Sequence, residues 1–433
     1  MQLIDKIRLI FKVIKIVRNK KKIIRNVFMV FKYEGLRGVW DKIYSIPQKL
    51  AVNQSKCENT KEVDYIAFDE LIENNSRRRK ILIVVHELSL TGAPIAAFFA
   101  AKIIKENGDV PVVVCEEDGP LKNEFAKQEI LVIVDSGLKQ EDNFKRLACN
   151  FNLVIINTIV PAMYINFLIE ETIPVIWWIH ESKLSYSTCP TPLPKELPDH
   201  IKVYCGGEYA RAALLAHRRN YNAEILLYGI DDISLETDIK LEDDKVVFSI
   251  VGTLEYRKGH RVFIKAVQLM PEHLRNKCKF IIVGKKVDNI YYEDVLRFKE
   301  KFSEQVVVLT ELPRNEVINI YNKSTAIVSS SLDDPMPIVM TEGMALSKVC
   351  ICSTGTGTAS LIEDKFNGLV FKNGSAKELL NKMIYIIENR DELDNIRYES
   401  RKIYEEYFQI SVFKYNLLKI VDKAEDAVNY VSI

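Results

Sequence analysis

Short apolar runs alternate with longer stretches of helical periodicity over most of this 433-residue chain. Runs such as Ile81–Val85 and Pro174–Ile179 are typical of strands buried on both faces of a parallel sheet. Between them, apolar residues recur every three or four positions, which is typical of amphipathic helices. Strands and helices that alternate with short connections predict an α/β fold with doubly wound sheets.

The strand–helix pattern stops near Ile230 and starts again at Lys245–Gly252. Residues 232–244 are acidic and polar, which indicates a linker between two α/β units, and the length of the chain fits two or three domains. The amphipathic end of the chain is expected to pack as a closing helix. We predict three parts: an N-terminal extension and linker (1–77), a first Rossmann-like domain (78–230, completed by about 410–433) and a second one (231–409).

The first 31 residues form a basic amphipathic pattern. Ile4, Ile7 and Phe11 fall on one helical face and Arg8 and Lys12 on the opposite one, and residues 1–25 carry nine Lys or Arg against one Asp. Such a helix is typical of proteins that lie on an anionic membrane surface, where each basic residue contributes about 1 kcal/mol. Packing on a partner protein or on the body of this chain is the alternative. The polar residues 50–77 are expected to form a linker.

Composition and charge narrow the function classes. Sixty Lys and Arg nearly balance 59 Asp and Glu, so overall charge argues against a nucleic-acid partner. The eight cysteines are scattered without a CxxC pair, which fits a reducing cytosol better than a disulfide framework. There is no run of 18 apolar residues and no cleavable signal pattern. We expect a cytoplasmic protein that is peripherally associated with the inner face of the cell membrane.

Two carboxylates eight positions apart mark a candidate site in the second unit. Asp334 lies in a loop braced by Pro335 and Pro337, and Glu342 lies inside the helix expected to begin near Pro337. The free N–H groups at the start of a helix bind anions or sugar oxygens. The spacing therefore predicts a cradle for a phosphorylated, polyhydroxylated ligand. A helix carboxylate and an exposed loop Asp without a shared role are the alternative.

Three further residues follow predicted strands at the edge where α/β sheets bind ligands. Gly92 lies between the first strand and a helix that begins with a proline, so backbone can approach a ligand there. His180 directly follows the strand at Pro174–Ile179, and Lys258 follows the strand at Lys245–Gly252. A structurally satisfied histidine and a solvated loop lysine are the alternatives for the last two.

In this order, the landmarks resemble the retaining GT-B glycosyltransferases of family four, also called glycosyltransferase group 1. The resemblance spans roughly residues 80–425 and implies two Rossmann-like domains that face a cleft. A single matching segment is not specific for the family, whereas six matching segments in the same order are. They are Leu90–Pro94, Trp178–Glu181, Gly229–Asp231, Arg257–Gly259, the pair Asp334 and Glu342, and Ile362–Leu369.

The resemblance also implies roles for the candidate residues. Glu342 would accept hydrogen bonds from the ribose hydroxyls of a nucleotide-sugar donor, and Lys258 would neutralise the diphosphate as the glycosidic bond breaks. Gly92 would offer its backbone N–H to the same diphosphate, and His180 would contact the donor sugar or the acceptor hydroxyl. Retention at the anomeric carbon and catalysis without a metal or other cofactor are implied as well. The donor sugar would meet Asp334 and the backbone of Pro335, Met336, Pro337 and Ile338.

Two positions depart from the family pattern. Asp334 stands where glutamate is usual, which shortens the reach of the carboxylate by one methylene. Thr253 stands where relatives frequently carry arginine, and threonine offers no bidentate fork to a phosphate. Arg257, next to Lys258, is the candidate that could substitute for it in donor binding.

These observations support one main hypothesis and two alternatives. The main one is a retaining, metal-independent hexosyl- or deoxyhexosyltransferase that moves a sugar from a nucleotide-sugar to a glycan or lipid-linked acceptor in bacterial cell-surface polysaccharide biosynthesis. A non-catalytic GT-B subunit that binds sugar or nucleotide and supports an active partner is the first alternative. A nucleotide-sugar epimerase on the same scaffold is the second, since fold alone does not fix the reaction.

Overall fold

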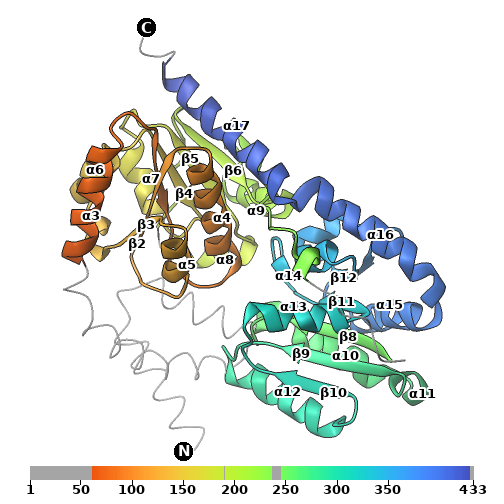
Figure 1. Ribbon diagram of the computed structural model, residues 1–433. Helices are drawn as coiled ribbons and strands as arrows, with labels where there is room; N and C mark the ends of the chain where they lie inside the picture. Colours follow the sequence, from red (N-terminus) through yellow and green to blue (C-terminus); the bar gives the residue numbers. More distant parts are fainter. Residues whose placement is uncertain (1–60, 190, 237–244, 430–433) are drawn as a thin grey trace, which may run out of the picture. The chain divides into compact units, whose positions relative to one another are not determined.

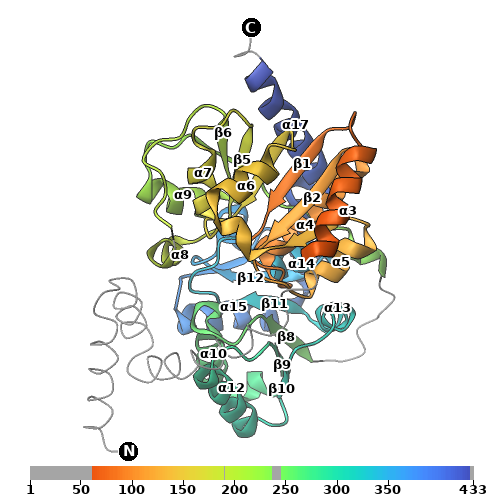
Figure 2. The ribbon, with the colours of Figure 1, turned by 90° about the vertical axis from the view of Figure 1, so that its left-hand side faces the viewer.

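Two parallel sheets organise the protein, shown in Figures 1 and 2 as a computed structural model that describes residues 61–189, 191–236 and 245–429. The first sheet has the strand order β3-β2-β1-β4-β5-β6-β7 and the second β10-β9-β8-β11-β12-β13. Both sheets are doubly wound, which confirms the predicted α/β fold class with two Rossmann-like units. We call residues 80–230 with their sheet the N-terminal half, and residues 245–403 with theirs the C-terminal half. The strands of the first sheet are β1 (Lys80–Val84), β2 (Val110–Cys115), β3 (Leu131–Val134), β4 (Leu153–Asn157), β5 (Val175–Ile179), β6 (Ile201–Cys205) and β7 (Ala223–Ile225).

Alternate residues of β1 show why this half needs helices on both faces of its sheet. Ile81 and Ile83 pack against one set of helices, and Leu82 and Val84 against another. The first set comprises α4 (Gly92–Glu106), α5 (Leu121–Lys127) and α17 (Ile410–Asn429). The second comprises α3 (Lys61–Asn74), α6 (Glu141–Ala148), α7 (Ala162–Leu168) and α9 (Glu208–His217).

The helix α3 corrects one prediction. Residues 50–77 were expected to form a polar linker, but from Lys61 the chain is helical, and α3 contacts β3. Phe68 is buried against Phe151, with ring centroids 5.9 Å apart, and Tyr65 donates a hydrogen bond to Asp135. A few apolar side chains on an otherwise polar segment are enough to cover this part of the sheet. The predicted basic amphipathic helix at residues 1–31 lies outside the described residues.

The C-terminal half repeats the arrangement. Phe248 and Phe280 stack in the core on one face of its sheet, and Tyr321 and Met340 are buried on the other. Its strands are β8 (Val246–Val251), β9 (Cys278–Val283), β10 (Val306–Leu309), β11 (Ala326–Ser329), β12 (Val349–Ser353) and β13 (Leu369–Phe371). The first face is covered by α10 (His260–Leu269), α11 (Glu272–Arg275), α12 (Asn289–Lys301), α15 (Ala376–Glu388) and the start of α16 (Leu393–Ile403), and the second by α13 (Arg314–Lys323) and α14 (Ile338–Ala345).

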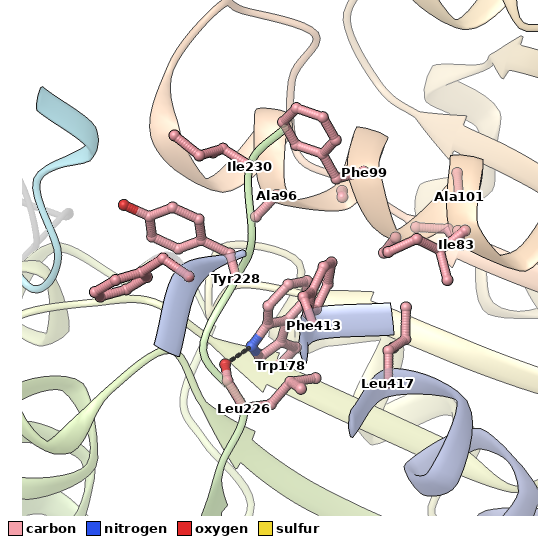
Figure 3. Close-up of a cluster of buried hydrophobic side chains, with 14 of the residues drawn as sticks. Ile83, Ala96, Phe99, Ala101, Trp178, Leu226, Tyr228, Ile230, Phe413 and Leu417 are labelled. Carbon is pink, nitrogen blue, oxygen red and sulfur yellow. Dashed lines mark hydrogen bonds between the residues drawn. The ribbon is translucent and has the colours of Figure 1, made fainter. Parts of the chain in front are cut away.

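The last helix, α17, returns to the N-terminal half, where it contacts α4, β4 and β5. Figure 3 shows how Phe413 of this helix lies beside Trp178, whose ring it stacks on at 5.5 Å. The indole N–H of Trp178 donates to the carbonyl of Leu226 at 2.9 Å, so this large side chain is fully buried and still satisfied. The outgoing and returning chains also pair: Ile230 N–H donates to Phe408, and Ile410 N–H donates to Ile230.

Each sheet has one point at which the strand order reverses direction along the chain. In the first sheet it lies between β1 and β4, and in the second between β8 and β11. The connections that leave these neighbouring strands run to opposite sides, which leaves a crevice at the carboxyl ends where ligands bind in doubly wound folds. Gly92 follows β1, Lys258 follows β8 and Asp334 follows β11, whereas His180 follows β5, the neighbour of β4. In the described part of the chain, no helix combines the length and apolar character needed to cross a bilayer.

Candidate functional site

A small pocket lies at the carboxyl ends of β8 and β11, the reversal point of the second sheet. It is lined by the last residues of these two strands, by Lys258 and His260, and by Pro337 and Val339 at the start of α14. Pro337 is the N-cap residue of α14, and no side chain in the described ranges caps that helix. Its first N–H groups and the positive end of its dipole are therefore directed at this end of the sheet.

A tight turn holds Lys258 in place. Gly259 adopts a left-handed conformation (φ 67°), and a Cβ there would come within 1.9 Å of the carbonyl oxygen of Ser330. Ser330 Oγ donates to the carbonyl of Gly259 at 2.9 Å, which fastens the turn to the loop after β11. The glycine after Lys258 is thus a structural requirement of the site.

Lys258 and Asp334 form the central ion pair. Lys258 Nζ lies 2.7 Å from Asp334 Oδ2, although the two residues are 76 positions apart in the sequence. Burial raises the pKa of Asp334, but the nearby cations Lys258 and Arg257 outweigh burial, so its pKa lies below the ordinary value and the carboxylate is ionised. Backbone bonds to Gly355 and from Gly357 fix Asp334 from both sides.

Arg257 reaches the same carboxylate, with its Nη1 3.4 Å from Asp334 Oδ2. It also contacts Glu255 Oε1 at 3.1 Å, and Thr253 Oγ1 donates to that oxygen at 2.7 Å. Thr253 therefore contacts a neighbouring glutamate, and Arg257 contacts the carboxylate that Lys258 also binds. That Arg257 substitutes for the missing arginine in donor binding remains a prediction.

Glu342 is buried in α14, whose first turn lines the pocket. Arg314 Nη1 lies 2.7 Å from its Oε1, and the hydroxyl of Tyr321 donates to its Oε2 at 2.9 Å. Burial is the main influence on the pKa of Glu342 and raises it above the ordinary value, whereas Arg314 and Tyr321 act in the opposite direction. The carboxylate is thus held in one orientation, and the half-exposed Arg314 stands between it and solvent.

The loop between Asp334 and α14 is packed too tightly for larger neighbours. A Cβ at Gly357 would come within 1.7 Å of the carbonyl oxygen of Pro335. The side chain of Met336 occupies the space next to Gly207 of the N-terminal half, where a Cβ would lie 2.8 Å from its methyl carbon. The predicted cradle from Pro335 to Ile338 is therefore a rigid loop that leads directly into the helix.

The reversal point of the first sheet carries uncharged groups. Gly92 is the first residue of α4, and Asn157 at the end of β4 donates to the carbonyl of Ala93 at 2.9 Å. This bond turns Asn157 Oδ1 toward His180 Nε2, 2.9 Å away, so the imidazole is the Nε2–H tautomer. Burial, with a contribution from His86, lowers the pKa of His180 to about 3, so this histidine is neutral.

Three groups that the sequence analysis did not identify join the two halves at Asp333. This buried carboxylate accepts hydrogen bonds from Ser182, which precedes α8 (Lys183–Thr188), and from the hydroxyl of Tyr209 at 2.8 Å. The only signals in the sequence were the Asp-Asp pair at 333–334 and a serine that follows the His180–Glu181 dipeptide. Arg314 and Tyr321, which hold Glu342, were also missed, because the sequence does not show which residues face α14.

The structure thus places the predicted residues in three groups. Lys258 and Arg257 both contact Asp334, and Glu342 lies further along the helix that lines the same pocket. His180, at the end of β5, is joined through Asn157 to the turn at Gly92 and Ala93, the reversal point of the other sheet. Over the described ranges, no three His, Cys, Asp or Glu side chains are arranged to hold a metal ion. The roles assigned to these residues, and a reaction without a metal, remain predictions.

The chain is similar to known glycosyltransferases in sequence and in fold. Residues 233–403 match the family model described as "Glycosyl transferases group 1", and residues 77–196 match "Glycosyl-transferase family 4". The structure of HepE from Anabaena in complex with UDP and glucose has a TM-score of 0.68 at 17% identity, over 80% of this chain and 100% of that one. A glycosyltransferase from Rickettsia africae has a TM-score of 0.67 at 19% identity, over 80% of this chain and 99% of that one.

Two curated relatives match shorter stretches. An uncharacterised glycosyltransferase of Methanocaldococcus jannaschii is 27% identical over 34% of this chain and 37% of its own length. An α-1,4-N-acetyl-D-galactosaminyltransferase of Campylobacter jejuni, whose name specifies an undecaprenol-diphosphate-linked acceptor, is 25% identical over 46% of this chain and 53% of its own. The matches thus cover between about a third and half of these relatives. Two glycosyltransferase family models thus match the two halves of the chain, whose fold is GT-B, and the chain is similar to the group 1 glycosyltransferases.

Proposed function

We propose that the protein transfers a sugar from a nucleotide-sugar donor to a hydroxyl of a glycan or lipid-linked acceptor, with retention at the anomeric carbon. The observation that carries this proposal is the pocket at the ends of β8 and β11, where Lys258 and the start of α14 converge next to Asp334. A cation and a helix N-terminus at one point form a site for a diphosphate. The HepE structures, which contain UDP, UDP-glucose, or UDP and glucose, share this fold.

In the proposed reaction, donor binding exchanges one partner of Lys258. The ion pair with Asp334 already neutralises the lysine in the free protein, and the diphosphate takes the place of the carboxylate as its partner. Asp334 then accepts hydrogen bonds from the sugar hydroxyls. This exchange keeps the lysine from being buried without a partner charge and selects ligands that carry both a phosphate and a sugar.

Glu342 accepts hydrogen bonds from the ribose. Its two oxygens already contact Arg314 and Tyr321, which fix the carboxylate, and each oxygen has lone pairs left for the nucleoside. A carboxylate oriented in advance loses little entropy when the donor binds. Arg314 is half exposed, so it can move aside as the nucleoside approaches.

The transfer itself breaks the bond between the anomeric carbon and the diphosphate oxygen. The acceptor oxygen bonds to the same face of that carbon, and its proton passes to the departing phosphate oxygen. The negative charge that develops on the leaving group meets Lys258, Arg257 and the α14 dipole, so these groups stabilise the transition state more than the ground state. The neutral His180 would contact the sugar or the acceptor as a hydrogen-bonding group, since its pKa of about 3 keeps it uncharged.

A donor screen tests the proposal. The purified protein is incubated with UDP-, GDP- and dTDP-sugars, and release of nucleoside diphosphate is measured with and without acceptor. We expect slow hydrolysis of one donor class, and Lys258→Met should reduce the rate at least tenfold. Lys265→Met, at an exposed position of the neighbouring helix α10, is the matched control and should keep the rate. No turnover with any donor would favour the alternative of a non-catalytic subunit.

We further propose that the acceptor is lipid-linked, in bacterial cell-surface polysaccharide synthesis, and that residues 1–31 attach the protein to the inner face of the cell membrane. The basic amphipathic sequence of these residues supports this, as does the undecaprenol-linked acceptor in the name of the Campylobacter relative. Deleting residues 1–31 should abolish co-sedimentation with anionic vesicles while donor hydrolysis persists. Undiminished sedimentation of the truncated protein would rule out this segment as the anchor.

A further inference from the structure

His260 is the most unusual polar side chain of the C-terminal half. It is the first residue of α10, it is 1% exposed, and it lines the pocket beside Lys258. Neither of its ring nitrogens has a hydrogen-bond partner among the described residues. Buried polar groups are nearly always paired, and each unpaired one costs about 1–3 kcal/mol. Two unpaired nitrogens on one buried ring at the wall of the pocket leave room for a hydrogen-bond partner that enters the pocket.

The surroundings of the ring indicate the chemistry of that partner. The groups that line the pocket include Lys258 and the start of α14, together with apolar and serine side chains, but no carboxylate. Burial, with a contribution from Lys258, lowers the pKa of His260 to about 3, so the ring is a neutral imidazole with one N–H donor. A neutral donor next to a cation and a helix N-terminus is suited to an oxyanion.

The backbone that carries the ring is held in place, and the ring itself is 1% exposed. Gly259, which precedes it, is held in a left-handed turn against Ser330, and His260 itself begins a helix whose core residues Phe263 and Val267 are fully buried. The imidazole is therefore fixed at the pocket before any ligand binds. A donor that is already oriented and already desolvated adds to binding without further ordering cost.

We propose that His260 is a second diphosphate ligand of the donor site, whose ring N–H donates a hydrogen bond to a phosphate oxygen beside Lys258. The proposal rests on the proposed function, because it assumes a nucleoside diphosphate in this pocket. Lys258 supplies a positive charge, which attracts any anion. His260 supplies a hydrogen-bond donor at a fixed point in the pocket. The phosphate that reaches furthest into the pocket accepts this bond, so His260 favours diphosphates over monophosphates.

Calorimetric titration with UDP, GDP and dTDP, and with the three monophosphates, tests this role. We expect His260→Phe to weaken the best diphosphate about tenfold and the matching monophosphate less than threefold. His260→Gln, which retains an N–H donor, should recover most of the loss. Phe263→Leu, a core change on the same helix, is the control for destabilisation: with a similar fall in melting temperature, it should leave diphosphate affinity unchanged.

A spectroscopic measurement complements the titration. The chain has six histidines, so ring ¹⁵N signals in ¹⁵N-histidine-labelled protein can be assigned by comparison with His260→Gln. The His260 signals should shift on saturation with the diphosphate and not with the monophosphate. Equal diphosphate affinity of wild type and His260→Phe, or unchanged His260 signals at saturation, would overturn the proposal alone. If the wild type binds no nucleoside diphosphate, both the role of His260 and the proposed function are contradicted.

Discussion

The reversal points of the two sheets have the same topology and opposite chemistry. At β1 and β4 the groups are a glycine at a helix start, Asn157 and the neutral His180, joined by uncharged hydrogen bonds. At β8 and β11 they are the partly buried Lys258 and the buried Asp334, joined by an ion pair. The strand order places a crevice at each reversal point, and the residues after the strands give the two crevices different chemistry. A cation next to a helix N-terminus suits a diphosphate, whereas the uncharged groups suit hydroxyl groups and the backbone contact to a phosphate that we predict for Gly92.

Acid should destabilise the fold at both reversal points, because each has a neutral histidine, the partly buried His180 and the buried His260. The pKa values of His180 and His260 are lowered from 6.5 to about 3, so below pH 6.5 the unfolded chain binds protons that the folded protein does not. The contribution of these two histidines is therefore complete above pH 6.5 and falls with decreasing pH by about 1.4 kcal/mol per pH unit for each. Glu181 acts in the opposite direction, because burial raises its pKa to about 7. Urea unfolding between pH 6.5 and 4.5 measures this slope. In His180→Gln and in His260→Gln the slope should decrease by the contribution of one proton, about 1.4 kcal/mol per pH unit. An unchanged slope in both variants would contradict the lowered pKa values of these histidines.

Glu342→Gln tests the proposed donor site at the ends of β8 and β11, where Glu342 is expected to bind the ribose. A hydrogen bond to a charged group contributes about 1.5–3 kcal/mol, so losing the charge should reduce donor affinity or hydrolysis at least tenfold. Glutamine keeps the shape of the side chain and can still accept from Tyr321. Glu388→Gln, at an exposed position of α15, serves as the control. Near-normal hydrolysis by Glu342→Gln would remove Glu342 from the donor site.

Tyr209→Phe tests the contact between the halves. It removes one of the two hydroxyl donors to the buried carboxylate of Asp333, so we expect the free energy of unfolding to fall by about 1.5–3 kcal/mol. Tyr398→Phe, at an exposed tyrosine of α16, should change stability by no more than about 0.5 kcal/mol. Equal effects in urea unfolding would mean that the Asp333 contact does not stabilise the fold.

Gly92→Ala has the smallest expected effect on stability and separates fold from function. A Cβ at Gly92 meets nothing within 4 Å, and its backbone does not have a left-handed φ, so stability should change by less than about 0.5 kcal/mol. If the diphosphate approaches this turn, the methyl group lies in its path, and donor affinity should fall severalfold. Gly343→Ala provides the contrast, because its Cβ would lie 2.9 Å from Cys350 Sγ and destabilise the core. Unaltered donor affinity in Gly92→Ala would exclude the turn from the site.

The sequence predicted the elements of the site better than the contacts between them. The apolar run before Lys258 placed this lysine after a strand, and the prolines before α14 placed Asp334 in the loop that leads into a helix. Both signals are local in the sequence. The partners of Asp333 are 151 and 124 positions away, and no periodicity connects residues so far apart. The helix α3 was missed for a different reason: its residues are mostly polar, and only packing on the sheet makes Phe68 part of a core.

The central claim is that the charged reversal point binds the diphosphate of the donor. Calorimetric titration of wild type and Lys258→Met with a nucleoside diphosphate and its monophosphate tests it most directly. We predict that Lys258→Met weakens binding of the diphosphate at least tenfold, and that the preference for the diphosphate over the monophosphate that remains is the contribution of His260. The melting temperature should fall, because the substitution leaves the buried carboxylate of Asp334 without the cation 2.7 Å away. If Lys258→Met binds the diphosphate as tightly as the wild type, the claim is contradicted.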